Sequence, residues 1–164
     1  MPLILSLSGY HNSGKTTLGT YLVSELVKRG FKVAVVKATK EEVLLTDKEG
    51  SDTWRYRKAG AEAVALLQSQ LLTLYFSHFP QNKEDFLDFL EALFPHYHLL
   101  LLEGFKGWSN IPKIWLLKEG EDPSEIRKKF GQVELILKPE EREKALNYLL
   151  EKLGAVKGCS PQVF

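Results

Sequence analysis

The sequence contains a single cysteine, Cys159, so no disulfide can form within one chain. A metal site that needs several thiolates is excluded for the same reason, and the composition fits a reducing cytosol. An excess of one charge is also absent, because 22 basic residues stand against 21 acidic ones and the formal net charge is +1. The overall field of such a chain is not expected to attract nucleic acid or an anionic membrane surface.

Long hydrophobic runs are missing too. The start of the chain has no basic leader, and its apolar run is too short for a signal peptide. No stretch approaches the ~20 apolar residues that a membrane-spanning helix needs. The content of 44% apolar and 26% charged residues in a chain of 164 is typical of a soluble globular domain. We therefore expect one cytoplasmic domain over residues 1–153 and a loose tail over residues 154–164.

Two strand-like runs flank an amphipathic segment near the N-terminus. Residues 3–8 form a short apolar run that ends at Gly9, which indicates a buried strand. Residues 15–29 carry leucines at helical spacing, and Gly30 closes the segment as a helix C-cap would. Residues 31–37 are rich in valine and predict a second strand. A strand, a helix and a strand in this order predict parallel pairing with a right-handed crossover.

The rest of the chain continues the alternation of strands and helices. Further helices are predicted over residues 52–59, 82–93, 122–130 and 139–153, and further strands over residues 62–68, 71–76, 99–102, 113–118 and 133–137. The strands over residues 62–68 and 71–76 are close enough to form a hairpin. The fold class is therefore α/β, a three-layer sandwich with a mostly parallel sheet and an antiparallel hairpin insertion. The polar stretch over residues 38–51 is longer than a plain connection, which favours a functional loop.

The turn after the first strand matches a phosphate-binding pattern. Residues 9–17 read Gly-Tyr-His-Asn-Ser-Gly-Lys-Thr-Thr, which fits G-x-x-x-x-G-K-S/T between a strand and a helix. In such a loop the backbone N–H groups and the helix N-terminus face phosphate oxygens. Lys15 would meet the β- and γ-phosphates, Thr16 would hold Mg²⁺, and Thr17 would contact the α-phosphate. The residues predicted to bind the nucleotide here are Gly9, His11, Asn12, Ser13, Gly14, Lys15, Thr16 and Thr17.

Acidic residues elsewhere are candidates for the second part of such a site. Glu103 follows a buried strand, at the edge of an open sheet where ligands bind, and could hold Mg²⁺ or polarise a nucleophile. Its alternative is an ordinary surface glutamate. Asp47 and Asp52 lie in or beside the long polar loop, where either could reach the metal, and the alternative is a solvated loop. Either aspartate, together with Glu103, is therefore a candidate for the acidic part of the site.

Basic residues near these positions could contact an anionic ligand. Lys37 ends the second strand, and Lys106 follows Glu103 by three residues. Arg55 and Arg57 would point to different sides of a helix, so that one of them could face a phosphate. A solvated surface side chain is the alternative for each lysine. The four histidines show no ligand spacing, and we interpret those outside the loop as structural.

Taken in order, these motifs resemble the MobB family of molybdopterin-guanine dinucleotide biosynthesis adapter proteins. The resemblance covers roughly residues 3–117. The motifs that carry it are the loop over residues 9–17, the strand-end Lys37, Asp47-x-x-Gly-Ser-Asp-Thr-x-Arg55, Ala59-Gly-Ala61, Glu103-Gly-Phe-Lys106 and Pro112-Lys-Ile114. The resemblance implies a dimeric, weakly hydrolysing GTP-binding protein that uses Mg²⁺ and assists the guanylyltransferase MobA. It also implies that Asp52 and Glu103 lie near the metal, which makes Lys15, Asp52 and Glu103 the catalytic candidates and Thr16, Asp52 and Glu103 the candidate metal ligands. Arg55 and Lys106 would then contact phosphate or cofactor.

The chain departs from the family at some positions, and two other functions remain open. No histidine follows Lys37, and no Asn-Lys-x-Asp guanine signature occurs, so GTP over ATP rests on the resemblance alone. A small-molecule kinase of the uridine-kinase type is the main alternative, with residues 118–130 as a lid. A binding module without catalysis is the third, in which the nucleotide would order residues 38–51 for a partner.

Overall fold

The computed structural model describes residues 1–41 and 46–155. Part of the long polar loop, residues 42–45, and most of the expected tail, with Cys159, lie outside the described residues. The chain divides into two compact units, one made of Met1–Thr39 with Glu91–Phe164 and the other of Lys40–Leu90. We call them unit 1 and unit 2 and describe each by itself. The expectation of a single domain over residues 1–153 stays a prediction.

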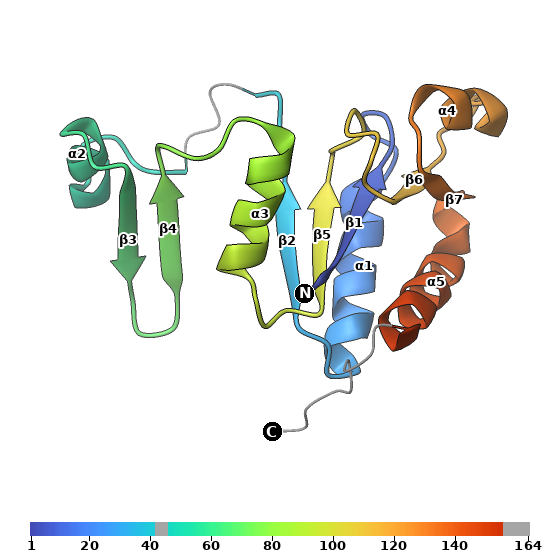
Figure 1. Ribbon diagram of the computed structural model, residues 1–164, viewed down its shortest axis with the longest axis horizontal. Coiled ribbons are helices and arrows are strands. Elements are labelled where there is room, and N and C mark those ends of the chain that lie inside the picture. The colour runs from blue at the N-terminus through green and yellow to red at the C-terminus, as the bar shows by residue number, and fades with distance from the viewer. Residues whose placement is uncertain (42–45, 156–164) are drawn as a thin grey trace. The chain divides into compact units, whose positions relative to one another are not determined.

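Unit 1 is built on a five-stranded parallel sheet in the order β2-β5-β1-β6-β7 (Figure 1). These strands are β1 (Leu3–Ser8), β2 (Val33–Lys37), β5 (Leu99–Glu103), β6 (Lys113–Leu116) and β7 (Val133–Leu137). The strand β5 reads Leu-Leu-Leu-Leu-Glu and is buried at every position. Such a continuous apolar run suits an interior strand covered on both faces. The mostly parallel α/β sheet predicted from the sequence is confirmed.

Helices cover both faces of this sheet, as the alternation of side chains along β6 shows. Ile114 and Leu116 join a core cluster with α1 (Lys15–Lys28) and α5 (Arg142–Ala155). Trp115 between them joins a second cluster with α4 (Pro123–Lys129). Because successive side chains of a strand point to opposite faces, α1 and α5 lie on one face and α4 on the other. Unit 1 therefore has the three layers that the sequence predicted.

The last helix begins differently from the prediction. We expected one helix from Pro139, but a 3-10 turn (η1, Pro139–Glu141) comes first and α5 starts at Arg142. The backbone N–H of Lys138 donates to Oε1 of Glu141 at 3.1 Å, and the N–H of Glu141 donates to the Lys138 carbonyl at 2.9 Å. Proline is well suited to this first turn because it has no N–H to satisfy. These bonds hold the turn after β7 in a tight conformation.

The first residue of β6, Lys113, is fully buried. Its ammonium donates to the carbonyl of Ile111 at 2.9 Å, to that of Gly131 at 3.5 Å, and to that of Trp108. A buried cation is tolerated when its donors are satisfied in this way. Lys113 therefore ties the loop before β6 to the turn that precedes β7.

Unit 2 contains α2 (Asp52–Lys58) and an antiparallel hairpin of β3 (Ala63–Leu67) and β4 (Leu72–Phe76). The helix α3 (Lys83–Leu93) begins in this unit. Phe76 of the hairpin and Phe89 of α3 meet edge to face, with ring centroids 5.3 Å apart. The hairpin insertion predicted from the sequence is confirmed. Among the residues that the structure describes, no helix combines the length and the apolar character needed to span a bilayer.

Candidate functional site

The glycine loop, residues 9–14, is shaped by two glycines. A Cβ atom on Gly9, whose φ is +157°, would lie 2.8 Å from the Leu116 carbonyl and 2.6 Å from the Ser13 hydroxyl. Gly14 caps α1 in the left-handed region with φ of +94°. A side chain would be too crowded at Gly9 and strained at Gly14. The sequence therefore needs glycine at both positions to curl the chain between β1 and α1.

The ammonium of Lys15 lies against the same loop. It donates to the carbonyls of Gly9 at 3.1 Å and Tyr10 at 2.9 Å. Burial is the largest cause that holds the pKa of Lys15 below its usual value. The Glu103 carboxylate raises this pKa, whereas the charges of Lys106, Lys37 and Lys118 lower it. Several cations therefore share this end of unit 1 with Lys15.

Glu103 stands beside this loop at the end of the central strand β5. Its Oε1 accepts a hydrogen bond from the Thr16 hydroxyl at 3.0 Å and lies 3.3 Å from the Lys37 ammonium. Lys37 is directly opposite Glu103 in the pairing of β2 with β5. Glu103 is 8% exposed, which marks it as unlike a freely solvated glutamate. The structure therefore brings Lys15, Thr16, Lys37 and Glu103 together, as the sequence predicted for the ends of parallel strands.

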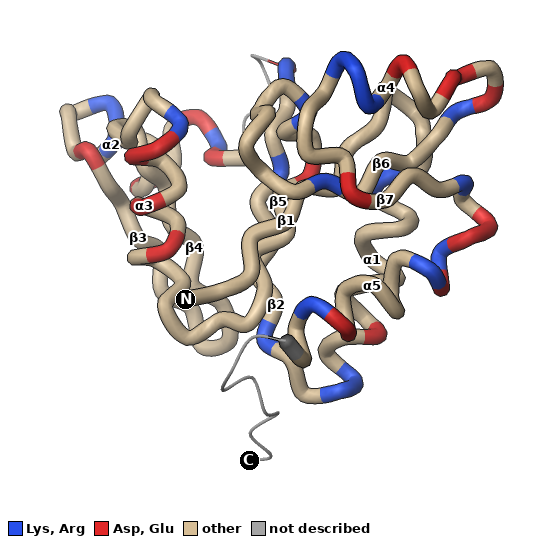
Figure 2. The backbone as a smooth tube through the Cα atoms, turned by 45° about the vertical axis from the view of Figure 1, so that its right-hand side comes forward, with Lys and Arg blue, Asp and Glu red and all other residues tan. Residues whose placement is uncertain are grey.

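More lysines extend this cationic region than the sequence analysis assigned. The Lys106 ammonium lies 4.7 Å from the centroid of the Tyr10 ring, and that of Lys129 lies 3.5 Å from the Tyr10 hydroxyl. Lys118 donates to the His11 carbonyl at 2.9 Å. Basic segments follow the loops at this end of the sheet and lie beside α4 (Figure 2). Lys106 was predicted as a contact to an anionic ligand, whereas Lys118 and Lys129 were considered only within the lid of the kinase alternative, because no motif places them beside the glycine loop.

An open cavity of about 550 Å³ adjoins the glycine loop. It lies between that loop and the segments that follow β6 and β7. Its lining residues are Asn12, Ser13, Leu117, Lys118, Glu119, Gly120, Glu121, Lys138, Pro139 and Glu140. Cavities of a few hundred Å³ at the carboxyl ends of parallel strands are typical of small-molecule sites. The glutamates of this lining were not predicted from the sequence, because no spacing singles them out.

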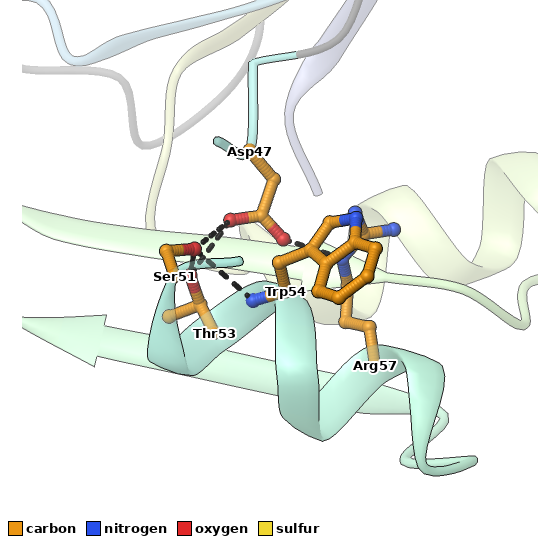
Figure 3. Close-up of polar contacts among 5 residues, drawn as sticks. All are labelled: Asp47, Ser51, Thr53, Trp54 and Arg57. Atoms are coloured by element: carbon orange, nitrogen blue, oxygen red, sulfur yellow. Dashed lines mark hydrogen bonds and ion pairs between the residues drawn. The ribbon is translucent and has the colours of Figure 1, made fainter. Parts of the chain in front are cut away.

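In unit 2, Asp47 is the centre of a separate polar network (Figure 3). Its Oδ1 accepts from the Thr53 hydroxyl at 2.7 Å and the Ser51 hydroxyl at 3.3 Å, and its Oδ2 accepts from Arg57 Nε at 2.6 Å. Ser51 also caps α2, since its hydroxyl accepts the Trp54 N–H at 3.3 Å. Both oxygens of Asp47 are therefore committed to fixing the start of α2.

Burial raises the pKa of Asp47, but the hydrogen bonds from Thr53 and Arg57 and the charge of Arg57 outweigh it and lower this pKa overall. Asp52 and Arg55 are exposed residues of the adjacent helix α2. The two units are described separately, so the roles of Asp52 and Arg55 toward metal and phosphate stay predictions. Asp47 and Arg57, which the sequence offered as ligand contacts, form an ion pair with each other.

The donors of unit 1 fit a magnesium nucleotide. No group of three or more His, Cys, Asp or Glu side chains that could hold a metal occurs among residues 1–41 and 46–155. Mg²⁺ in nucleotide sites commonly takes one or two protein oxygens and obtains the rest from phosphates and water. Thr16 Oγ1 and Glu103 are oxygen donors 3.0 Å apart beside the Lys15 ammonium. This set suits a cation that arrives with a polyphosphate.

Comparisons with known proteins agree on one family. The model of the family described as MobB, molybdopterin guanine dinucleotide synthesis protein B, matches residues 4–137. The molybdopterin-guanine dinucleotide biosynthesis adapter protein of Haemophilus influenzae is 37% identical over 118 residues, which cover 71% of this chain and 64% of that protein. Its Escherichia coli counterpart is 34% identical over 119 residues, with 71% and 66% covered. The aligned part thus spans slightly less than two thirds of these relatives.

Solved structures show the same fold. A crystal structure of molybdopterin-guanine biosynthesis protein B superposes with a TM-score of 0.69 at 25% identity, covering 93% of this chain and 99% of that one. A structure of Bacillus subtilis MobB gives a TM-score of 0.67 at 23% identity, covering 93% and 98%. Both matches extend across nearly the whole chain.

Proposed function

Since this chain belongs to the MobB family, we propose that it is a GTP-binding adapter in molybdopterin guanine dinucleotide synthesis. The observation that carries the proposal is the convergence of Lys15, Thr16 and Glu103 at the glycine loop. The loop would accept the phosphates through its N–H groups and the N-terminus of α1. Two carbonyls of the loop, those of Gly9 and Tyr10, already hold the Lys15 ammonium beside it.

Mg²⁺ would be held by Thr16 and Glu103 and would neutralise charge on the outer phosphates. Lys15 would exchange its two carbonyl partners for phosphate oxygens. Lys37, paired with Glu103, would orient this carboxylate and add a positive charge at the edge of the site. Lys106 and Lys118, which already depress the pKa of Lys15, would be stabilised by the arrival of a polyanion.

We infer that hydrolysis by this site is slow. The arginines of unit 1 are engaged away from the glycine loop: Arg29 pairs with Glu25, Arg127 donates to the Val133 carbonyl, and Arg142 stacks on Tyr21. An arginine finger raises the rate of phosphoryl transfer by ~10³ to 10⁵. The cations that surround the loop are lysines, which neutralise charge without the bidentate geometry of arginine.

A slow nucleotide-binding protein suits an adapter that acts with a partner enzyme. We propose that this partner is a guanylyltransferase of the MobA type, which would carry out the transfer of GMP. We also propose that the protein is a homodimer. The hairpin of unit 2 exposes the leucines Leu66, Leu67, Leu71, Leu72 and Leu74. Apolar surface gathered in this way is usually covered by a partner, and light scattering of a Leu67→Ser, Leu72→Ser variant would show a monomer if the hairpin joins two copies.

Titration calorimetry with Mg·GTP tests the proposed function directly. We expect saturable binding by the wild type and a loss of affinity of ~100-fold or more in Lys15→Ala, because phosphate charge would lose its main partner. Lys28→Ala is the matched control, since Lys28 pairs with Glu25 on the same helix. Unchanged binding by Lys15→Ala, or none by the wild type, would refute the proposal. Rapid transfer of phosphate to a nucleoside would instead indicate the kinase alternative.

A further inference from the structure

The cavity beside the glycine loop contains an unusual pair of polar atoms. Among the residues that the structure describes, two buried side-chain oxygens lack a hydrogen-bond partner, Ser13 Oγ and Glu121 Oε1. Both residues line this same cavity of about 550 Å³. A buried polar atom without a partner is costly, and natural proteins keep few of them without a reason. Their coincidence at one cavity indicates that a ligand supplies the missing donors.

Glu121 is held in place by its other oxygen. Its Oε2 accepts the Lys118 N–H at 2.8 Å and lies 3.5 Å from Nε1 of Trp115, which is fully buried. The carboxylate is thereby anchored to the end of β6, while Oε1 is buried without a partner among the described residues. Lys118 in turn donates from its ammonium to the His11 carbonyl. The cavity wall and the glycine loop are thus linked through one residue.

The charges around the cavity favour a neutral ring over another phosphate. Three glutamates line it, Glu119, Glu121 and Glu140, against two lysines, one of which is bonded to the loop. A phosphate there would meet more negative than positive charge. The cationic side of the loop, with Lys15 and Lys106, is the better place for phosphates. A nucleotide whose phosphates occupy the loop would extend its base past Asn12 and Ser13 into this cavity.

Building on the proposed function, we infer that Glu121 and Lys138 recognise the base of the bound nucleotide. They select guanine by its 2-amino-4-oxopyrimidine edge. Guanine offers a ring N–H and an amino group to a carboxylate, and its O6 and N7 accept from an ammonium. Adenine has an amino group where guanine has O6, so it would turn a donor toward the lysine. A pterin carries the same edge as guanine. The contiguity of the cavity with the phosphate loop assigns the site to the nucleotide.

Calorimetry with a set of nucleotides tests this inference. The wild type should bind Mg·GTP ~10- to 100-fold more tightly than Mg·ITP, which lacks the 2-amino group, or Mg·ATP, because a buried acceptor would otherwise stay unpaired. In Glu121→Gln, most of the preference for Mg·GTP over Mg·ITP and Mg·ATP should be lost. Glutamine keeps one oxygen for the Lys118 N–H and replaces the free acceptor with a donor. Glu119→Gln, a change at an exposed glutamate of the same cavity, is the matched control and should keep the ratio.

Binding of inorganic triphosphate distinguishes the phosphate site in the glycine loop from the base site in the cavity. All three proteins should bind it equally, with Lys15→Ala much weaker, if the loop is intact and holds phosphate. Wild type that binds GTP through Lys15 but shows equal GTP, ITP and ATP affinities would overturn the base assignment alone. The base assignment would also be overturned if Glu121→Gln and Glu119→Gln had the same ratio of GTP affinity to ITP or ATP affinity. Weaker binding of a free pterin by Glu121→Gln, with an unchanged GTP to ITP ratio, would also overturn it. Failure of the wild type to bind triphosphate or GTP would overturn the proposed function and this inference with it.

Discussion

Glu103 in unit 1 and Asp47 in unit 2 are both nearly buried carboxylates, 8% and 5% exposed, but they use their oxygens differently. Asp47 accepts three side-chain hydrogen bonds that occupy both oxygens and fix α2. Glu103 binds Thr16 and Lys37 through one oxygen, Oε1, beside the glycine loop. A carboxylate whose two oxygens are bonded to the helix that follows it stabilises structure, whereas one that stands beside a candidate phosphate loop can contribute to a ligand site. Burial alone therefore does not identify a functional acid.

Of the changes to these two carboxylates and their partners, the replacement of Glu103 should have the largest effect on nucleotide binding. We expect Glu103→Gln to weaken Mg·GTP binding ~10-fold or more, because an amide is a poorer Mg²⁺ ligand than a carboxylate. Without Mg²⁺ the difference should be smaller. Calorimetry with and without the metal measures both. Glu143→Gln, on the exposed surface of α5, is the control, and equal dependence on Mg²⁺ in the two variants would contradict this role.

Removing the charge of Asp47 should instead affect stability. Asp47→Asn would lose the ion pair with Arg57 and disturb the hydroxyl bonds to Thr53 and Ser51, so the thermal unfolding midpoint should fall. Affinity for Mg·GTP should remain close to that of the wild type. Asp52→Asn, five residues along and exposed, should leave the midpoint much less changed. An unaltered midpoint in Asp47→Asn would show that the network does not stabilise unit 2.

The same network should make stability depend on pH. The pKa of Asp47 is lowered in the folded protein, so its contribution is fully present above the unfolded pKa, about 3.9, and is lost as the pH falls through the lower folded value. The difference in midpoint between wild type and Asp47→Asn should be constant near neutrality and shrink below about pH 4. Thermal unfolding at fixed ionic strength across this range measures it. A difference that grows on acidification would contradict the sign.

The smallest effect is expected at Lys37. Its side chain is 60% exposed, so the ion pair with Glu103 should contribute less than ~1 kcal/mol to the free energy of unfolding. Urea unfolding of Lys37→Ala measures this contribution, with Lys28→Ala as a surface ion-pair control. A much larger loss would mean that Lys37 supports the site structurally, and the contrast between Glu103 and Asp47 would need revision.

The sequence predicted the strands, the helices and the centre of the site well, for physical reasons. A short apolar run such as residues 99–102 favours a buried strand in a chain that alternates strands and helices, and the carboxyl ends of parallel strands share one edge of the sheet. The sequence therefore placed Glu103 near Lys15 and Lys37. The start of α5 was predicted three residues early, since Pro139 suits the first turn of either a 3-10 or an α-helix.

The cavity residues that follow β6 and β7 could not be predicted from a motif, because they have no fixed spacing. Glu121 and Lys138 are 17 positions apart and line one cavity only because β6 and β7 are neighbours. The sequence offered Asp47 as a metal or substrate contact, because a sequence does not show whether the oxygens of an acid in a polar loop are already bonded. Deciding that requires the positions of Thr53 and Arg57 in three dimensions.

Chemical labelling of the buried Lys113 would report local opening of the five-stranded sheet. Reagents that acylate amines need access to the nitrogen, and the Lys113 ammonium is enclosed by three carbonyls at the start of β6. It can react only when the loop before β6 moves away from the turn that precedes β7. Those two strands lead to the two sides of the cavity that would hold the base. The rate at which Lys113 is labelled therefore measures local opening of the sheet. A lower rate with nucleotide would show that the bound ligand suppresses this opening.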